Sequence, residues 1–77
     1  MTNRLPVISG RQAVKVFKKF GYVQLPRRGK GSHMILVHEK SGVILTVPDH
    51  KELDRGTLRA LIRDAGISRT QFQKAAR

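Results

Sequence analysis

The chain has no cysteine and no tryptophan, and only five of its 77 residues are acidic. Without cysteine it has no disulfide framework, no thiol nucleophile and no thiolate ligand for a metal. Its three histidines, His33, His38 and His50, show none of the close pairings typical of zinc sites. We therefore expect neither a bound metal nor another cofactor.

Long apolar runs are also lacking. No segment approaches the roughly 20 residues needed to span a bilayer, and no apolar signal-peptide region follows the N-terminus. We expect a cytoplasmic protein without membrane association. At 77 residues the chain makes one domain, residues 1–77, with one small core and no deep cleft. Any functional site should be shallow and suited to a large, extended substrate.

Positive charge is what the sequence has in excess. Sixteen Lys and Arg residues oppose five Asp and Glu, giving a formal net charge of +11. Such an excess on a small domain indicates a polyanionic partner such as a nucleic acid. The alternative is a solvated basic surface with no ligand. A membrane-surface role fits less well, because the cations do not form one face of a long amphipathic helix.

The first half of the chain predicts a helix followed by strands. Ser9 and Gln12 form a capping-box pattern at the start of a helix over 10–20, and Gly21 suits the left-handed position that ends it. Strands are expected over 22–25 and 33–38, and a turn over 39–42 leads into a third strand over 43–47.

The second half predicts two helices. Pro48 breaks the sheet, and Asp54 can cap a helix with an apolar stripe of Leu58, Leu61, Ile62 and Ala65. Gly66 ends this helix, and Ser68 with Gln71 forms a second capping box for a short terminal helix that includes Phe72. The predicted fold is α+β with the order α-β-β-β-α: a three-stranded antiparallel sheet with helices on one face.

The second strand is apolar on both of its faces. His33, Ile35 and Val37 share one face, and Met34 and Leu36 share the other. A sheet covered by helices on one side is normally polar on the other side. We therefore expect the second face to be covered by the N-terminal residues, by the terminal helix, or by a protein partner.

The segment before the second strand combines cations, glycines and a histidine. Cationic side chains can bind a phosphodiester, glycine lets the backbone approach it, and histidine transfers protons near neutral pH. We expect His33 to be the catalytic residue; the alternative is a strand histidine that hydrogen-bonds to a neighbouring backbone. The predicted RNA-binding residues are Arg27, Arg28, Gly29, Lys30, Gly31, Ser32, Lys51 and Arg55.

The remaining candidates are weaker. His50 is a candidate second acid or base if the loop after Pro48 folds toward the start of the second strand; otherwise it is a loop or cap residue. His38 is interpreted as structural, because it lies on the opposite strand face from His33. Lys51, Arg55 and Arg59 either extend an RNA track or are solvated cations.

Five segments of the chain resemble segments of the HicA-type toxins, the small mRNA interferases of toxin–antitoxin pairs, and they occur along the chain in the same order as in that family. They are Gly31-Ser32-His33, Phe20-Gly21-Tyr22-Val23, Val47-Pro48-Asp49-His50, Leu53-Asp54-Arg55-Gly56-Thr57-Leu58 and Arg63-Asp64-Ala65-Gly66-Ile67-Ser68. The resemblance covers about residues 9–70. It implies a fold like a double-stranded-RNA-binding domain, His33 as the catalytic histidine, and a HicB-type antitoxin as partner. The chain departs from the family at Met34, where members often have a histidine or another polar or aromatic residue.

Three functions follow from these observations. The leading one is a toxin endoribonuclease that cleaves mRNA without a metal. The second is a non-catalytic RNA-binding module of the same fold. The third, a DNA-binding regulator, is disfavoured because three strands separate the main helices and leave no helix-turn-helix.

Overall fold

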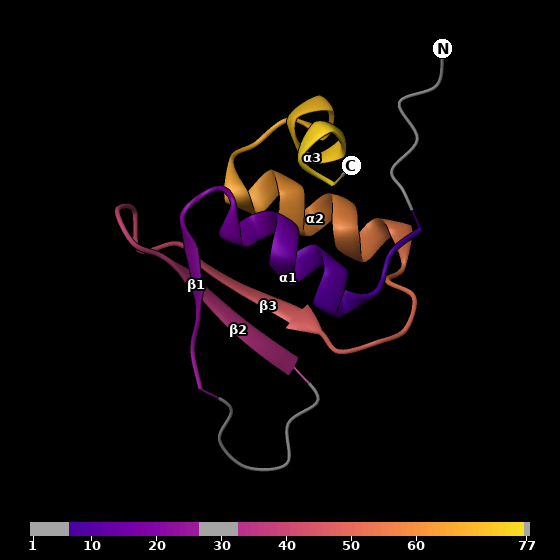
Figure 1. The fold of residues 1–77 in the computed structure, drawn as a ribbon, viewed down its shortest axis with the longest axis horizontal. Coiled ribbons are helices and arrows are strands. Elements are labelled where there is room, and N and C mark those ends of the chain that lie inside the picture. Colours follow the sequence, from indigo (N-terminus) through magenta and orange to yellow (C-terminus); the bar gives the residue numbers. More distant parts are fainter. Residues whose placement is uncertain (1–6, 27–32, 77) are drawn as a thin grey trace.

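The structure is a computed structural model that describes residues 7–26 and 33–76. In this part of the chain, three antiparallel strands form one open sheet, and the helices lie together on one side of it (Figure 1). The elements are α1 (Gly10–Lys18), β1 (Tyr22–Gln24), β2 (His33–His38), β3 (Ile44–Pro48), α2 (Arg55–Ala65) and α3 (Arg69–Ala75). The predicted α+β class and α-β-β-β-α order are confirmed.

Helix α1 begins at the predicted capping box. The Gln12 amide donates to the Ser9 hydroxyl at 3.1 Å, and the Ser9 amide donates to the Gln12 side-chain oxygen at 2.9 Å. The helix ends at Lys18, two residues before the predicted end, because the chain then turns through Gly21 at φ +93°. This left-handed conformation favours glycine, as the sequence predicted.

The central strand is β2, and its register fixes which side chains share a face. His33 lies opposite Pro48, and Leu36 lies opposite both Gln24 of β1 and Leu45 of β3. Pro48, which was predicted to break the sheet, is thus the last residue of β3, and the strand ends directly after it. A proline lacks a donor N–H, and it is tolerated here because it ends an edge strand.

The core lies between the sheet and the helices. It contains one face of the sheet, the apolar stripes of α1 and α2, and Phe72 of α3. The ring centroid of Phe72 lies 5.4 Å from that of Phe17. The buried members are Ala13, Val14, Val16, Phe17, Tyr22, Met34, Leu36, Leu45, Val47, Leu53, Leu58, Leu61, Ile62 and Phe72.

The other face of the sheet is open among the described residues. Val23, Val37 and Ile44 are adjacent across the three strands, and Val23 and Ile44 are 41% and 64% exposed. The prediction that the terminal helix covers this face is wrong, because α3 packs on α1 and α2 through Phe72. Residues 1–6 lie outside the described part of the chain.

His38 has the structural role that the sequence indicated. Its Nε2 atom lies 2.9 Å from the carbonyl oxygen of Phe20, and its Nδ1 atom accepts hydrogen bonds from the amides of Lys40 and Ser41. The ring is therefore a neutral Nε2–H tautomer that joins the end of α1 to the β2–β3 turn.

Helix α2 differs from the prediction at its start. Asp54 occupies the N-cap position, but its side chain makes no capping hydrogen bond. Gly66 ends the helix at φ +73°, as predicted, and α3 begins with the predicted Ser68–Gln71 capping box. Among the described residues, no helix has the length and apolar character needed to cross a membrane.

Candidate nucleic-acid interface

His33 lies at the first position of the central strand and is exposed to solvent. The next residue, Met34, is buried under the helices, so strand alternation places His33 on the open face of the sheet. Within residues 7–26 and 33–76, His33 makes no hydrogen bond and no ion pair. Its imidazole is therefore accessible to a large substrate, and no contact with a described backbone group occupies its nitrogens.

The predicted phosphate-binding loop lies outside the described residues. The structure therefore does not test the predictions for Arg27, Arg28, Gly29, Lys30, Gly31 and Ser32.

His50 lies at the same end of the sheet as His33. Pro48 pairs with His33, and His50 follows two residues later with an exposed side chain. The carbonyl oxygen of His50 accepts a hydrogen bond of 2.9 Å from the amide of Gly10, which joins this loop to the start of α1. His50 and Lys51 line a surface depression of about 400 Å³ together with Ser9, Arg11 and Asp49.

Arg55 and Arg59 lie further along the chain, on α2. Both side chains are exposed. Within the described residues neither makes a hydrogen bond or ion pair, and neither lines the depression beside His50. The structure therefore brings Lys51 close to His50 but does not place the two arginines with them.

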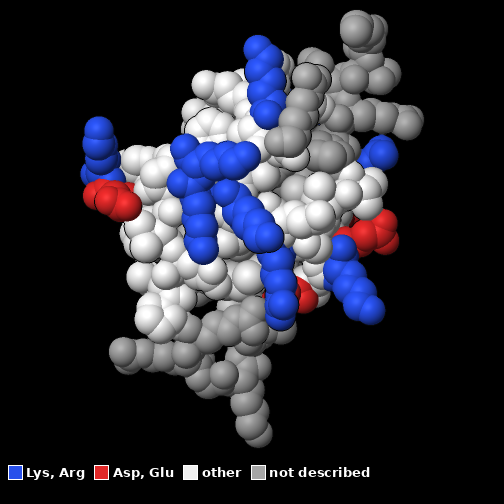
Figure 2. Space-filling model, viewed as in Figure 1, with Lys and Arg blue, Asp and Glu red and all other residues white. Residues whose placement is uncertain are grey.

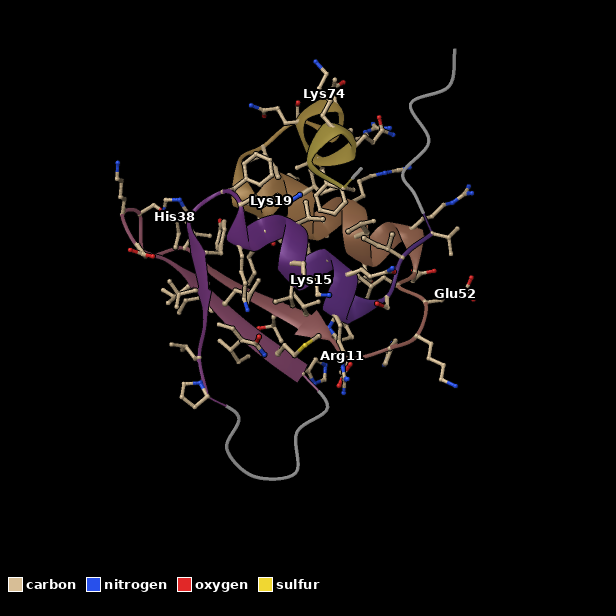
Figure 3. The ribbon with its side chains drawn as sticks, in the orientation of Figure 1. Arg11, Lys15, Lys19, His38, Glu52 and Lys74 are labelled. Atoms are coloured by element: carbon tan, nitrogen blue, oxygen red, sulfur yellow. The ribbon has the colours of Figure 1, made fainter. Side chains whose placement is uncertain are left out.

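Sequence reasoning passed over the exposed face of α1. Arg11, Lys15 and Lys18 are spaced i, i+4 and i+7, which puts them within an arc of about 60° on the helix. Lysine and arginine side chains gather over α1 in Figure 2. In Figure 3, Arg11, Lys15, Lys19 and Lys74 follow one another from the start of α1 toward α3. The signal was readable in the sequence as a basic stripe opposite the apolar one.

A groove runs beside this basic stripe. It has a volume of about 290 Å³ and is lined by Arg11, Val14, Lys15, Lys18, Gln24 and Met34. Arg11 lines both this groove and the depression that contains His50 and Lys51. Arg11 therefore borders both hollows, near the end of the sheet where β2 begins.

Arg11 is held by an ion pair with Asp49. Its Nε atom lies 3.2 Å from Oδ1 of Asp49, and its Nη2 atom lies 3.5 Å from Oδ2. The Arg11 side chain is 74% exposed and that of Asp49 18%. A pair this exposed contributes only about 0–1 kcal/mol to stability, so its main effect is to orient the guanidinium group.

Arginine, lysine and histidine side chains thus line the exposed face of α1 and the depression beside His50. Among the described residues, no three His, Cys, Asp or Glu side chains form a group that could hold a metal ion. The arrangement is suited to binding phosphates, with an exposed imidazole at one end of the surface.

Comparison with known families identifies the chain. Residues 10–67 match the family described as the HicA toxin of bacterial toxin–antitoxin systems. A search among curated proteins returned no match. The match extends from the start of α1 to just beyond α2, and so includes the whole sheet. The chain belongs to the HicA toxin family.

Proposed function

We propose that this protein is a toxin endoribonuclease that cleaves mRNA by metal-independent acid–base catalysis. The observation that carries the proposal is the position of His33, an exposed imidazole at the start of the central strand of a HicA-family fold. The chain has a formal net charge of +11, as binding of an RNA substrate requires.

In the proposed reaction, neutral His33 accepts the proton of the 2′-hydroxyl group. The 2′-oxygen attacks the adjacent phosphorus, the bond from phosphorus to the 5′-oxygen breaks, and an acid donates a proton to that leaving oxygen. The products are a 2′,3′-cyclic phosphate and a free 5′-hydroxyl. A positioned imidazole contributes about 10²–10⁴-fold to such a rate.

The other groups have roles in the same scheme. We assign phosphate binding to the side chains of Arg27, Arg28, Lys30 and Ser32 and the amides of Gly29 and Gly31, where charge develops in the transition state. His50 is the candidate acid, since it lies two residues after Pro48, which pairs with His33 in the sheet. Lys51 lies beside it in the same depression, and Arg55 is assigned to more distant phosphates.

A HicB-type antitoxin is the proposed protein partner. The open sheet face offers it an apolar row of Val23, Val37 and Ile44 on the face that also includes His33. A partner bound there would cover the imidazole as well as the aliphatic side chains. One contact would then stabilise the complex and block the proposed catalytic site.

Comparison of the wild-type chain with His33→Ala tests catalysis. Induced in cells, the wild type should arrest growth and fragment transcripts. With purified RNA it should give products with 5′-hydroxyl ends, and His33→Ala should cleave about 10²–10⁴-fold more slowly. Thermal unfolding serves as the control, because an exposed side chain can be truncated with little effect on stability.

Two outcomes would overturn parts of this proposal. Equal cleavage by the wild type and His33→Ala would remove His33 from the mechanism. RNA binding without cleavage by the wild type would favour the alternative, a non-catalytic RNA-binding module. Cleavage should persist in a chelator, and its loss there would contradict the metal-independent scheme.

A further inference from the structure

The basic stripe of α1 has cations without a local partner. Within residues 7–26 and 33–76, Lys15 and Lys18 make no hydrogen bond or ion pair, and both are exposed. Four of the chain's five acidic residues lie elsewhere on the surface: Glu39 in the β2–β3 turn, Glu52 and Asp54 before α2, and Asp64 on α2. The stripe therefore retains a positive field that no neighbouring carboxylate cancels at these two positions.

Lys19 provides a contrast one residue further along. Its Nζ atom donates a hydrogen bond of 2.6 Å to the carbonyl oxygen of Ala75, at the end of α3. This contact gives Lys19 a structural role in holding α3. Lys15 and Lys18 interact favourably with the dipole of α1 near its C-terminus, by only about 0.3–1 kcal/mol. This interaction does not depend on the groove beside them.

The groove beside Lys15 and Lys18 points to the form of the ligand. Its volume of about 290 Å³ suits a nucleotide-sized group and not the full width of a duplex. The groove is also lined by Gln24 of β1 and Met34 of β2. Met34 faces the helices and His33 faces the open side of the sheet, so a strand bound in the groove would reach His33 around the end of the sheet. Along the helix axis, Arg11, Lys15 and Lys18 rise by about 6 and 4.5 Å in succession, which is comparable to the spacing of phosphates along an extended strand.

We propose that this groove is a binding track for single-stranded RNA, in which Lys15 and Lys18 contact successive phosphates. Arg11, oriented by Asp49, directs the strand from the groove to the depression beside His50 and so to His33. The identification of the ligand as RNA rests on the proposed function. The track itself rests on the charge and shape of the α1 face.

Fluorescence anisotropy tests the track in a His33→Ala background, with a short, unstructured, labelled RNA as the probe. Replacing both Lys15 and Lys18 by glutamine should weaken binding by about tenfold or more at 0.1 M salt. It should also reduce the slope of log K against log salt by about 1.4, because each lost contact with a single strand removes about 0.7. The matched control replaces Lys40 and Arg69, exposed cations outside the groove, by glutamine.

The control pair should change affinity no more than about twofold and leave the salt slope unchanged. Equal losses in both double variants would show a general charge effect and overturn the track, as would an unaltered slope in the Lys15/Lys18 variant. An unlabelled duplex that competes better than a single strand would overturn the assignment of the ligand. Circular dichroism confirms that each variant is folded.

Failure of the track and failure of the proposed function give different results. If His33→Ala abolishes cleavage but the Lys15/Lys18 variant binds RNA normally, the nuclease stands and the track is wrong. If His33→Ala cleaves like the wild type while the Lys15/Lys18 variant loses binding, the track stands and the catalytic assignment is wrong.

Discussion

Gly10 lies where α1 crosses the end of β3, and its missing side chain lets the two elements touch. A Cβ atom there would overlap the carbonyl oxygen of Pro48 and lie 3.2 Å from Cε of Met34. The Gly10 amide also donates to the carbonyl oxygen of His50. This close approach holds the loop that includes His50 against the start of α1.

Gly10→Ala should therefore destabilise the protein, by about 1–3 kcal/mol, because overpacking against a backbone outweighs the higher helix propensity of alanine. Gly56→Ala on α2 is the matched control. Its added Cβ would meet only Oδ2 of Asp54, at 3.4 Å, so stability should rise by about 0.5–1 kcal/mol. Urea denaturation measures both, and a stabilising Gly10→Ala would contradict the close contact.

Tyr22 is a buried residue with an unsatisfied polar group. Its side chain is 3% exposed, and its hydroxyl has no hydrogen-bond partner among the described residues. Burial raises the pKa of Tyr22 above its usual value of 10.0, and the negative charge of Asp64 raises this pKa further. The folded state therefore disfavours the tyrosinate.

The raised pKa of Tyr22 determines how the stability of the protein should change with pH. Because the pKa of Tyr22 is higher in the folded than in the unfolded state, its contribution to stability is complete below about pH 10 and is lost as pH rises through the folded value. Tyr22→Phe should be as stable as the wild type at pH 7, or up to about 1 kcal/mol more stable. It should also lose less stability above pH 10. Denaturant curves of the two proteins, measured in parallel up to strongly alkaline pH, test this expectation. Equal losses of stability above pH 10 in the wild type and in Tyr22→Phe would refute this account.

At the scale of elements, the helix ends were the most predictable features. Both capping boxes, at Ser9 and Ser68, form as the spacing indicated, because the partners are three residues apart and need no tertiary contact. The glycine positions at the ends of α1 and α2 follow from the same local chemistry. Strand ends were less predictable: β3 is displaced by one residue and includes Pro48, because pairing with β2 sets its limits.

The three N-caps differ in their hydrogen bonds, and their variants should differ accordingly. Ser9→Ala removes a hydrogen bond to the Gln12 amide and should cost about 1 kcal/mol. Asp54 makes no capping hydrogen bond, so Asp54→Ala should cost less, about 0.3–1 kcal/mol from its charge near the helix start, and the cost should shrink at high salt. Equal, salt-independent losses in thermal unfolding would argue against this distinction.

At the scale of the whole molecule, the two sides of the sheet have different roles. One side is buried under the helices and forms the core. The other presents His33 together with the aliphatic row of Val23, Val37 and Ile44. This is the surface to which we assign the antitoxin, since no described segment of this chain covers it and exposed apolar patches are typical of interaction sites.

Replacing Val23 and Ile44 by serine should therefore weaken antitoxin binding without loss of fold. The expected cost is roughly 2 kcal/mol, or about 30-fold in Kd, from the apolar area no longer buried in the complex. Co-purification and calorimetry with a HicB-type antitoxin measure the effect. Val7→Ser is the matched control, since Val7 is 60% exposed and precedes α1. Undiminished binding by the double serine variant would place the antitoxin elsewhere.

The sequence by itself determined the order of the elements and the capping boxes of α1 and α3, because periodicity and turn chemistry are local. The assignment of His33 as the catalytic residue stays a prediction. The sequence also predicted that the sheet would be apolar on both faces. Only the tertiary structure decided that α3 packs on the other helices and leaves the second face open. It also brought Arg11 to Asp49 and placed the α1 cations beside a groove next to Met34. These contacts join residues far apart in the chain, so their geometry depends on how helices and sheet pack and no local pattern encodes it.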